Sequence, residues 1–240
     1  MDANSTVPPF ARVDAGPALL FATLFEIAVM MVVAIMFVSA AWSYTLHGSL
    51  LLTAFLLVLA LYGAGLFTLG ALGVAFRLCP FDRNGPAVSP RDQNGFMLAV
   101  ALSNFLFRSL GAPLLASPYI ATWFYRLSGS RLAGPIMHGG KMPIFDPWGV
   151  DCGRNVIIGV GARVFSHLNP GNGPNFAHTV TLGDDVVVGV SSVVMPGAII
   201  GAGAIILPNS TVTSHTVVGA NELWGGSPAK FIKDKTHDRA

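Results

Sequence analysis

The apolar positions between Cys152 and Val217 repeat every six residues. The repeated positions, with one break after the third, are Cys152, Ile158, Val164, Leu182, Val188, Val194, Ile200, Ile206 and Val212. A period of six fits neither an amphipathic helix, whose period is about 3.6 residues, nor a half-buried strand, whose period is about 2. It is the period of a parallel β-helix, in which about six residues form one flat side of a three-sided coil.

Two further positions of each repeat support this prediction. A small or β-branched residue stands two positions before each apolar one, as Val186 does before Val188, and a glycine such as Gly189 often follows. We expect the large apolar side chains to stack inside the prism and the glycines to lie at its corners, where a side chain would crowd the turn. The repeat is long enough for only about three to four coils, which implies caps and oligomer partners.

The one long interruption of the repeat is the segment Ser166–Thr179, which contains His167 and His178. Because the register of the repeat is the same on both sides, we predict a loop pushed out of the prism wall while the flanking coils stay stacked. Such a loop could reach a neighbouring prism and close a pocket. A histidine at its root could act as a general base near neutral pH, although a histidine in such a place is also often structural.

Two long apolar stretches precede the repeat. Ala18–Trp42 is apolar except for Glu26 and Ser39, and the run from Leu50 to Phe76 carries no charge. Each is long enough, at about 1.5 Å per residue, to cross a hydrocarbon core of ~30 Å. We predict two transmembrane helices joined by a tight turn. The acidic Glu26 could have a functional or a structural role, and the sequence leaves that open.

Basic residues predict the orientation of this hairpin. The connecting turn has no Lys or Arg, whereas Arg12 precedes the first helix and Arg77, Arg83 and Arg91 follow the second. Both ends should therefore face the cytoplasm. The expected location is the inner membrane, with several spans and with the repeat domain on the cytoplasmic side.

Residues 80–95 predict a linker of turns, because they contain three prolines and two Asn-Gly pairs. Phe96–Leu110 and Pro113–Leu127 are apolar and aromatic but too short to span. They are expected to be interfacial helices, with the aromatic side chains of residues 123–125 at headgroup level. Packing against the prism as a cap is the compatible alternative.

The predicted organisation has five parts: a tail (1–17), a transmembrane hairpin (18–78), a linker with interfacial helices (79–130), a β-helix domain (131–222) and a closing segment (223–240). We expect a short helix from Phe231 in the last part.

The composition, 52% hydrophobic and 11% charged against about 25% charged in soluble domains, places part of the chain in lipid. A net charge of +2 without a basic run argues against nucleic-acid binding. Cys79 and Cys152 form neither a metal pair nor a disulfide framework.

The repeat and its flanks resemble the hexapeptide-repeat (left-handed β-helix) acyltransferases, above all the sugar O-acetyltransferases. A weaker likeness is to membrane-associated members of exopolysaccharide assembly and to the C-terminal region of polylysine-type synthetases. The segments that carry the resemblance lie at Ile144–Pro147, Cys152–Gly159, Phe165–His167, Val180–Gly189, Val194–Gly201 and Gly225–Lys230.

The resemblance implies a homotrimer with sites between subunits, a left-handed coil and acetyl-CoA as co-substrate, without a metal. His167 matches the general base that deprotonates a hydroxyl or amine acceptor, and His178 is the second candidate. Asp146 matches the acid that helps to hold the acceptor. The residues that match coenzyme contacts are Val190, Pro208, Thr213, Ser214, Lys230 and Lys233.

Two other classes remain open. The γ-type carbonic anhydrases share this prism and hold zinc with three histidines at a subunit interface, which His138, His167 and His178 could supply, although their spacing differs from the family's. The third class is a non-enzymatic trimeric scaffold on the membrane. Within the acyltransferase class, the acceptor, the choice between O- and N-acylation, the acyl length and the pathway stay open.

Overall fold

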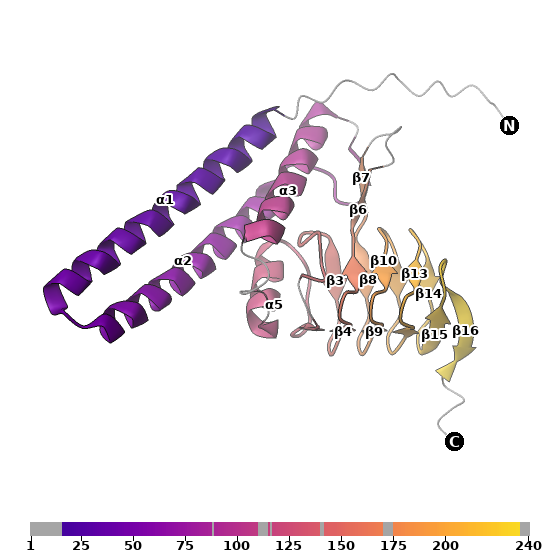
Figure 1. The fold of residues 1–240 in the computed structure, drawn as a ribbon. Coiled ribbons are helices and arrows are strands. Elements are labelled where there is room, and N and C mark those ends of the chain that lie inside the picture. The colour runs from indigo at the N-terminus through magenta and orange to yellow at the C-terminus, as the bar shows by residue number, and fades with distance from the viewer. Residues whose placement is uncertain are drawn as a thin grey trace.

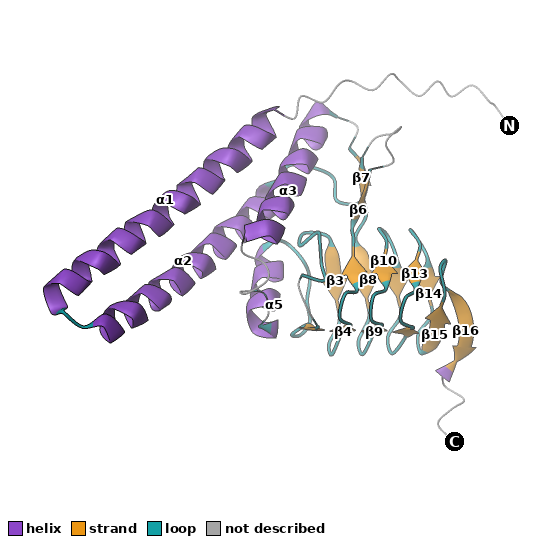
Figure 2. Cartoon of the chain, in the orientation of Figure 1, coloured by secondary structure: helices purple, strands orange, loops and turns teal. Residues whose placement is uncertain are grey.

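The computed structural model describes residues 16–87, 89–109, 115, 117–139, 142–169 and 175–235. Helices come first in the chain and strands follow, and the two kinds of element form separate ends of the molecule (Figures 1 and 2). Helices α1 (Gly16–His47) and α2 (Leu50–Leu78) form an extended antiparallel hairpin that projects away from the strands. The tail before residue 16, with Arg12, and the side chain of Glu26 lie outside the described part.

The predicted pair of long helices is confirmed as secondary structure, and both helices are longer than expected. Only Gly48 and Ser49 separate them, and the Ser49 hydroxyl accepts the backbone N–H of Leu52 as an N-cap. By length and apolarity, α2 is the one helix among the described residues that could cross a membrane, and a shorter apolar stretch, Ala34–Leu46, lies in α1. Two membrane crossings therefore stay a prediction.

Helices α3 (Pro90–Ser109) and α5 (Pro118–Leu127) occupy the region expected to hold interfacial helices. Helix α3 begins inside the predicted linker. Phe124 and Tyr125 of α5 are fully buried, whereas Trp123 is 42% exposed. Phe124 and Tyr125 are therefore packed inside the protein, as the capping alternative predicts. Of the three aromatic side chains, only Trp123 is exposed enough to reach a headgroup region.

Helix α5 closes the first end of the prism by direct hydrogen bonds. Its Thr122 hydroxyl accepts the N–H of Ile136 at 3.2 Å, and the Arg126 guanidinium donates to the carbonyl of Leu132 at 2.8 Å. These bonds satisfy backbone groups that the first coil would otherwise leave without partners.

The strands form a three-sided β-helix. Its faces are built by β3 (Val150–Cys152), β8 (Val180–Leu182), β11 (Ile199–Ile200) and β14 (Val217–Val218); by β2 (Met137–His138), β4 (Ile157–Ile158), β9 (Val187–Val188), β12 (Ile205–Ile206) and β15 (Glu222–Gly225); and by β5 (Arg163–Val164), β10 (Val193–Val194) and β13 (Thr211–Val212). Within each face all these neighbours pair in parallel.

The register gives the coil length directly. Val193 pairs with Thr211, which lies three hexads further along the chain, and this spacing confirms the predicted coil of three hexads. Across the interruption, Arg163 pairs with Val193, which lies five hexads further along. Because the extra length is two whole hexads, it leaves the wall without changing which side chains face inward.

The predicted inward positions are all buried. The nine apolar residues of the repeat are at most 5% exposed, and the small residues two positions earlier, from Val156 to Ser210, are at most 2% exposed. The corner glycines are needed because coils stack closely there. A Cβ on Gly189 would lie 2.5 Å from the backbone nitrogen of Pro208. The left-handedness of the coil stays a prediction.

The expected closing helix from Phe231 is wrong. Residues Lys230–Asp234 form strand β16, which pairs antiparallel with β15. The last coil exposes a row of unpaired backbone groups at its edge, and an antiparallel strand satisfies them where a helix could not.

The close stacking predicts that Gly189→Ala destabilises the prism by about 1–3 kcal/mol, because the new methyl group meets backbone rather than a movable side chain. Thermal unfolding measures this loss. The matched control is Val190→Ala at the same corner, whose side chain is 48% exposed and whose change should cost less than about 0.5 kcal/mol. Equal losses in both variants would refute the stacking argument.

Candidate active site

The interruption is an antiparallel hairpin that leaves the prism wall, as Figure 1 shows. Strand β6 (His167–Leu168) pairs with β7 (Phe176–Ala177). The loop extruded from the wall is therefore confirmed. The sequence did not predict that the linker would join it: β1 (Gly85–Pro86) pairs antiparallel with β7 as a third strand.

Two further bonds fix the linker to the hairpin. The Thr179 N–H donates to the Asn84 side-chain oxygen at 2.9 Å, and the Ala87 N–H donates to the carbonyl of Asn175 at 2.7 Å. The segment that leaves the helical hairpin therefore holds both the root and the far part of the hairpin that carries His167.

Asp146 and His167 form the central pair of this site. Asp146 is fully buried, and its Oδ1 lies 2.7 Å from Nδ1 of His167. Its Oδ2 accepts the N–H of Ser166 at 2.7 Å. A parallel bridge between Ile144 and Val164 sets this arrangement, because it brings the residues two positions further along each segment to the same level.

The environment of His167 sets its protonation. Burial, the largest effect, disfavours the imidazolium, but the hydrogen bond and the negative charge of Asp146 together outweigh it and raise the pKa of His167 above its usual 6.5. When Nδ1–H of the neutral ring donates its hydrogen bond to the Asp146 carboxylate, the free lone pair lies on Nε2. The side chain is 25% exposed, so the ring is partly accessible from solvent.

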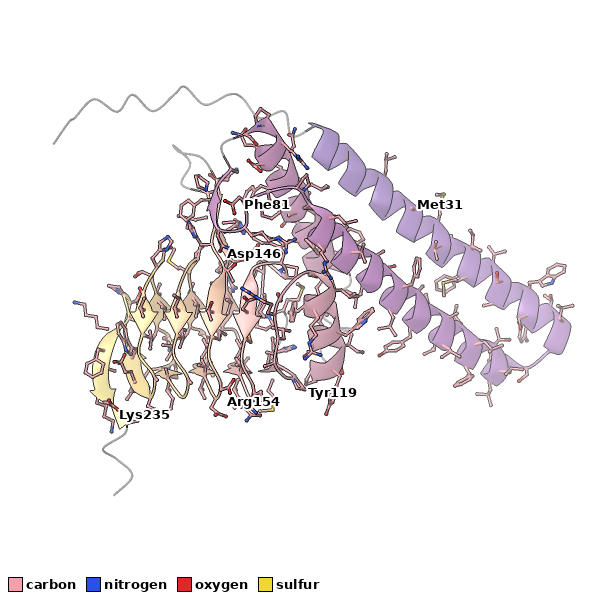
Figure 3. All side chains as sticks on the ribbon, turned by 180° about the vertical axis from the view of Figure 1, so that it is seen from behind. Met31, Phe81, Tyr119, Asp146, Arg154 and Lys235 are labelled. Carbon is pink, nitrogen blue, oxygen red and sulfur yellow. The ribbon has the colours of Figure 1, made fainter. Side chains whose placement is uncertain are left out.

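An aromatic cluster joins the helices to this pair. Phe96 of α3 contacts the His167 ring edge-on, with ring centroids 5.5 Å apart. Phe81 lies against both Phe96 and Trp148, at 6.0 Å and 4.9 Å. Figure 3 places Phe81 and Asp146 at the junction of the helices with the prism. Sequence reasoning missed these aromatic residues, because their spacing gives no sign that they meet at the hairpin root.

His178 lies at the other root of the hairpin, in a different environment. Its ring is 4.5 Å from that of His215, and burial, followed by the charge of His215, lowers its pKa despite the opposing charge of Asp82. The buried carboxylate of this site pairs with His167. The geometry thus separates two histidines that the sequence treated as a first and a second candidate.

The predicted coenzyme contacts lie at exposed corners of the prism. Val190 and Pro208 stack at the corner after β9 and β12, and Thr213 and Ser214 lie at the corner after β13. The face β5–β10–β13 lies between these two corners, and the His167 hairpin leaves from the second of them. Lys230 and Lys233 lie on exposed strand β16, at the far end from α5.

Among the described residues, neither the two cysteines nor any group of metal-ligating side chains forms a reactive site. Burial raises the pKa of Cys79 to about 11 and that of Cys152 to about 12, so both thiols are protonated at neutral pH. Among the residues that the structure describes, no three His, Cys, Asp or Glu side chains form a group that could hold a metal ion. His138, His167 and His178 are therefore not brought together within one chain.

Comparison with known proteins identifies the same hexapeptide repeat that builds the β-helix. Residues 179–214 match the family model described as bacterial transferase hexapeptide (six repeats). An uncharacterised protein of Dictyostelium discoideum is 29% identical over 105 residues, which cover 42% of this chain and 41% of that protein. The mitochondrial gamma carbonic anhydrase 2 of Arabidopsis thaliana is 33% identical over 86 residues, 36% of this chain and 26% of that one. The matches thus span less than half the length of either relative.

Solved structures give weaker likenesses. A maltose O-acetyltransferase from Clostridium difficile 630 aligns with a TM-score of 0.43 at 18% identity, over 57% of this chain and 86% of that one. A galactoside acetyltransferase in complex with coenzyme A aligns with a TM-score of 0.41 at 18% identity, over 59% and 81%. The fold assignment rests on the chain's own strand pairing and on the hexapeptide match.

A coil of three hexads, a corner glycine that touches the next coil and a hexapeptide match together define a hexapeptide-repeat β-helix protein. The hexapeptide repeat that the sequence predicted is thus confirmed, and residues 179–214 carry the repeat of the bacterial hexapeptide transferases.

The Asp146–His167 pair predicts that Asp146→Asn lowers the pKa of His167, because the substitution removes the negative charge that stabilises the imidazolium. NMR titration of the His167 ring protons measures the shift. The matched control is Asp151→Asn, since Asp151 pairs with the exposed Arg131 instead. An unchanged pKa in Asp146→Asn would contradict the assigned cause.

Proposed function

We propose that this chain is a membrane-anchored acyltransferase that uses acetyl-CoA and in which His167 is the general base. The observation that carries the proposal is the buried Asp146 carboxylate, 2.7 Å from Nδ1 of a partly exposed histidine at the root of the extruded hairpin. A histidine held in this way has a fixed tautomer and a raised pKa, the two properties that a general base working near neutral pH needs.

The proposed reaction is a direct transfer. Nε2 of His167 accepts the proton of a hydroxyl or amine acceptor while the acceptor oxygen or nitrogen forms a bond to the thioester carbonyl carbon. The carbonyl oxygen becomes an oxyanion, for which backbone N–H groups at the prism corners are candidate donors. The tetrahedral intermediate then breaks its carbon–sulfur bond, and the coenzyme leaves as a thiol with the proton that His167 held.

Asp146 takes a positioning role in this proposal. Both of its oxygens are already engaged, one by His167 and one by the Ser166 N–H, and its side chain is fully buried. Contact with the acceptor, which the family resemblance implies, would require one of these bonds to break. Orientation of His167 and stabilisation of its charge need no such change.

The coenzyme is proposed to lie along the face β5–β10–β13, between the corner of Val190 and Pro208 and the corner of Thr213 and Ser214. Val190 can contribute only its backbone and an apolar surface. Lys230 and Lys233 on β16 would face the phosphate end. A neighbouring prism in a homotrimer would form the other wall of this groove, as the family resemblance implies.

Membrane anchoring is supported by the surface of the helical hairpin. Large apolar side chains of α1 and α2 are exposed, among them Val38 at 70% and Leu51 at 84%. The apolar stretch Leu50–Phe76 of α2 rises about 40 Å at about 1.5 Å per residue, more than enough to cross the ~30 Å of a hydrocarbon core. A large contiguous apolar surface of this kind marks a site of membrane or protein interaction. With Arg77 in the last turn of α2 and Arg83 after it, the prism would face the cytoplasm of the inner membrane.

The catalytic proposal predicts that His167→Ala lowers the rate of acetyl transfer by at least about 100-fold, because the acceptor loses the group that takes its proton. The rate of CoA thiol release with a panel of sugar and amine acceptors measures it, and size-exclusion chromatography checks that the assembly is unchanged. His178→Ala is the matched control and should retain most of the activity. Full activity in His167→Ala would remove this residue from the role.

The membrane proposal predicts that the full chain stays with the membrane fraction after washing with alkaline carbonate and leaves it only with detergent, because its apolar hairpin is within the bilayer. Release by carbonate alone would contradict insertion. A peripheral protein bound through charge would also be released by high salt.

The match to a gamma carbonic anhydrase keeps a zinc enzyme as the second candidate. A site between subunits could combine His138, His167 and His178 from different chains. Metal analysis of the purified protein separates the two candidates, because about one zinc per subunit together with hydration of CO2 would favour the second. A scaffold without activity would give no thermal shift with acetyl-CoA.

A further inference from the structure

A cavity rich in arginine lies where α2 and α5 end against the first coil. It has a volume of about 480 Å³, and Arg77, Arg83, Arg126 and Arg131 line it. None of its lining residues in the described structure is acidic.

Two of the four arginines have clear structural partners. Arg83 donates to the carbonyls of Phe76 and Ser128 and thereby caps the C-terminal ends of both helices. Arg131 pairs with Asp151 at 2.6 Å. The two helix ends together contribute a negative charge of about one unit. Four guanidinium groups against Asp151 and these two helix ends leave an excess of about two positive charges.

The excess charge belongs to Arg77 and Arg126. In the described structure the Arg77 side chain has no hydrogen bond or ion pair, while Arg126 donates Nε and Nη2 to the Leu132 carbonyl and keeps its charge unpaired. Arg77 and Arg83 line the same cavity, and burial, the largest effect, lowers the pKa of Arg83, with the like charge of Arg77 acting in the same direction. A bound anion would relieve the repulsion between these like charges.

An apolar groove lies further along the same two helices. It has a volume of about 460 Å³, and its walls are Leu66 and Phe67 of α2 and Tyr119, Ile120 and Trp123 of α5. This groove carries no charged group.

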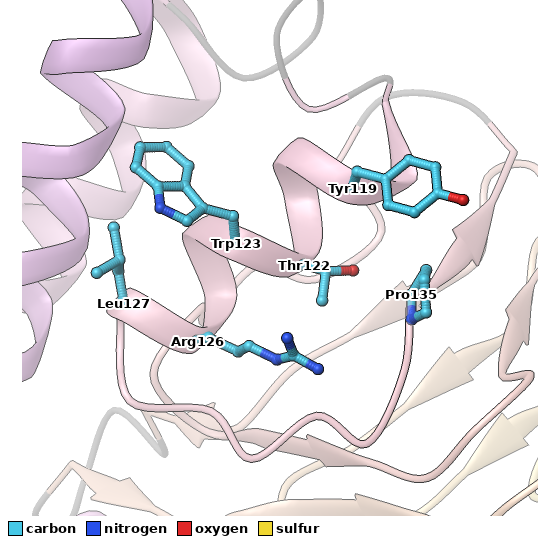
Figure 4. A pocket seen from close by; sticks show the side chains of 6 residues that line it. All are labelled: Tyr119, Thr122, Trp123, Arg126, Leu127 and Pro135. Atoms are coloured by element: carbon cyan, nitrogen blue, oxygen red, sulfur yellow. The ribbon is translucent and has the colours of Figure 1, made fainter.

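A third cavity, of about 470 Å³, has lining residues in common with both the groove and the arginine cavity. It shares Tyr119 and Trp123 with the groove and Arg126 with the arginine cavity. Figure 4 shows the Arg126 side chain extending towards Pro135, with Tyr119 at the other end of α5, in its first turn. The lining residues therefore change from apolar side chains in the groove, through Tyr119 and Trp123, to Arg126 and Arg77, whose charges are unpaired.

We propose that the apolar groove and the arginine cavity together bind one anionic phospholipid, with an acyl chain between Phe67 and Ile120 and the phosphate at Arg77 and Arg126. The proposal rests on the membrane insertion argued above. From Phe67 to Arg77, α2 rises about 15 Å, which is half of a ~30 Å hydrocarbon core and so fits one leaflet. A free phosphate would leave the apolar groove unfilled, and a lipid without net charge would leave the arginines uncompensated.

The test uses the full chain in detergent, titrated with phosphatidylglycerol, with phosphatidylcholine of the same acyl chains and with glycerol phosphate, and bound molecules are counted by native mass spectrometry. We expect phosphatidylglycerol to bind about tenfold more tightly than phosphatidylcholine, and glycerol phosphate to bind far more weakly than either. Arg77→Gln should reduce the affinity for phosphatidylglycerol about fivefold, in line with about 1 kcal/mol for each basic residue near a lipid headgroup, and leave phosphatidylcholine unchanged.

Matched control variants separate binding at this site from nonspecific electrostatic and hydrophobic association with lipid. Arg91→Gln removes one exposed charge outside the cavity, and Phe55→Ala removes an exposed ring on the same helix outside the groove, so neither should change the affinities. Phe67→Ala should weaken both lipids. Equal binding of the two lipids, an equal effect of Arg91→Gln, or glycerol phosphate binding as tightly as phosphatidylglycerol would each overturn the proposal.

This outcome is independent of the proposed reaction. The lipid preference is measured in detergent without acceptor or acetyl-CoA, so a chain without transferase activity could still show it. Conversely, loss of lipid preference in wild type with intact acetyl transfer would remove the lipid site alone.

Discussion

The structure depends on the in-register stacking of coils of three hexads each. Each hexad points two side chains inward, a small one and a larger aliphatic one, and each is covered by its equivalents in the coils before and after. Because a buried aliphatic side chain contributes about 1.5–3 kcal/mol only when it is covered, no coil is stable alone and the ends must be closed. Helix α5 closes one end and β16 the other, which explains why elements outside the repeat are packed so tightly against it.

The same constraint creates the site. A detour from the prism wall is tolerated only if it returns in register, and the hairpin between Val164 and Leu182 does so by leaving two hexads outside. Its root then lies beside the first, irregular coil, from which Asp146 reaches His167. A carboxylate without exposure is costly to bury unless it is hydrogen-bonded. Here the backbone N–H of Ser166 and the imidazole of His167 satisfy it, so the buried pair is stable.

The helical part is connected to this site rather than merely attached to the domain. Strand β1 extends the hairpin, Phe96 packs on the His167 ring, and Arg83 joins the ends of α2 and α5 to the carbonyl of Trp148. Under the proposed anchoring, the base would be held at a fixed height above the bilayer. The arginine cavity lies beside Phe81, on the other side of the aromatic cluster from His167, so a lipid there would sit next to the wall of the site without entering it.

The sequence by itself determined the β-helix, because a period of six leaves only one arrangement in which Leu182, Val188 and Val194 all face a core. It also determined the extruded loop and two long helices, since register and apolar length are local properties of the chain. Only the tertiary structure decided that Asp146 holds His167, that the linker becomes a strand, that Phe124 and Tyr125 face the prism, and that Phe231 lies in a strand. Each of these outcomes depends on which unpaired backbone group or buried charge lies opposite in space, and no period along the chain encodes such a neighbour.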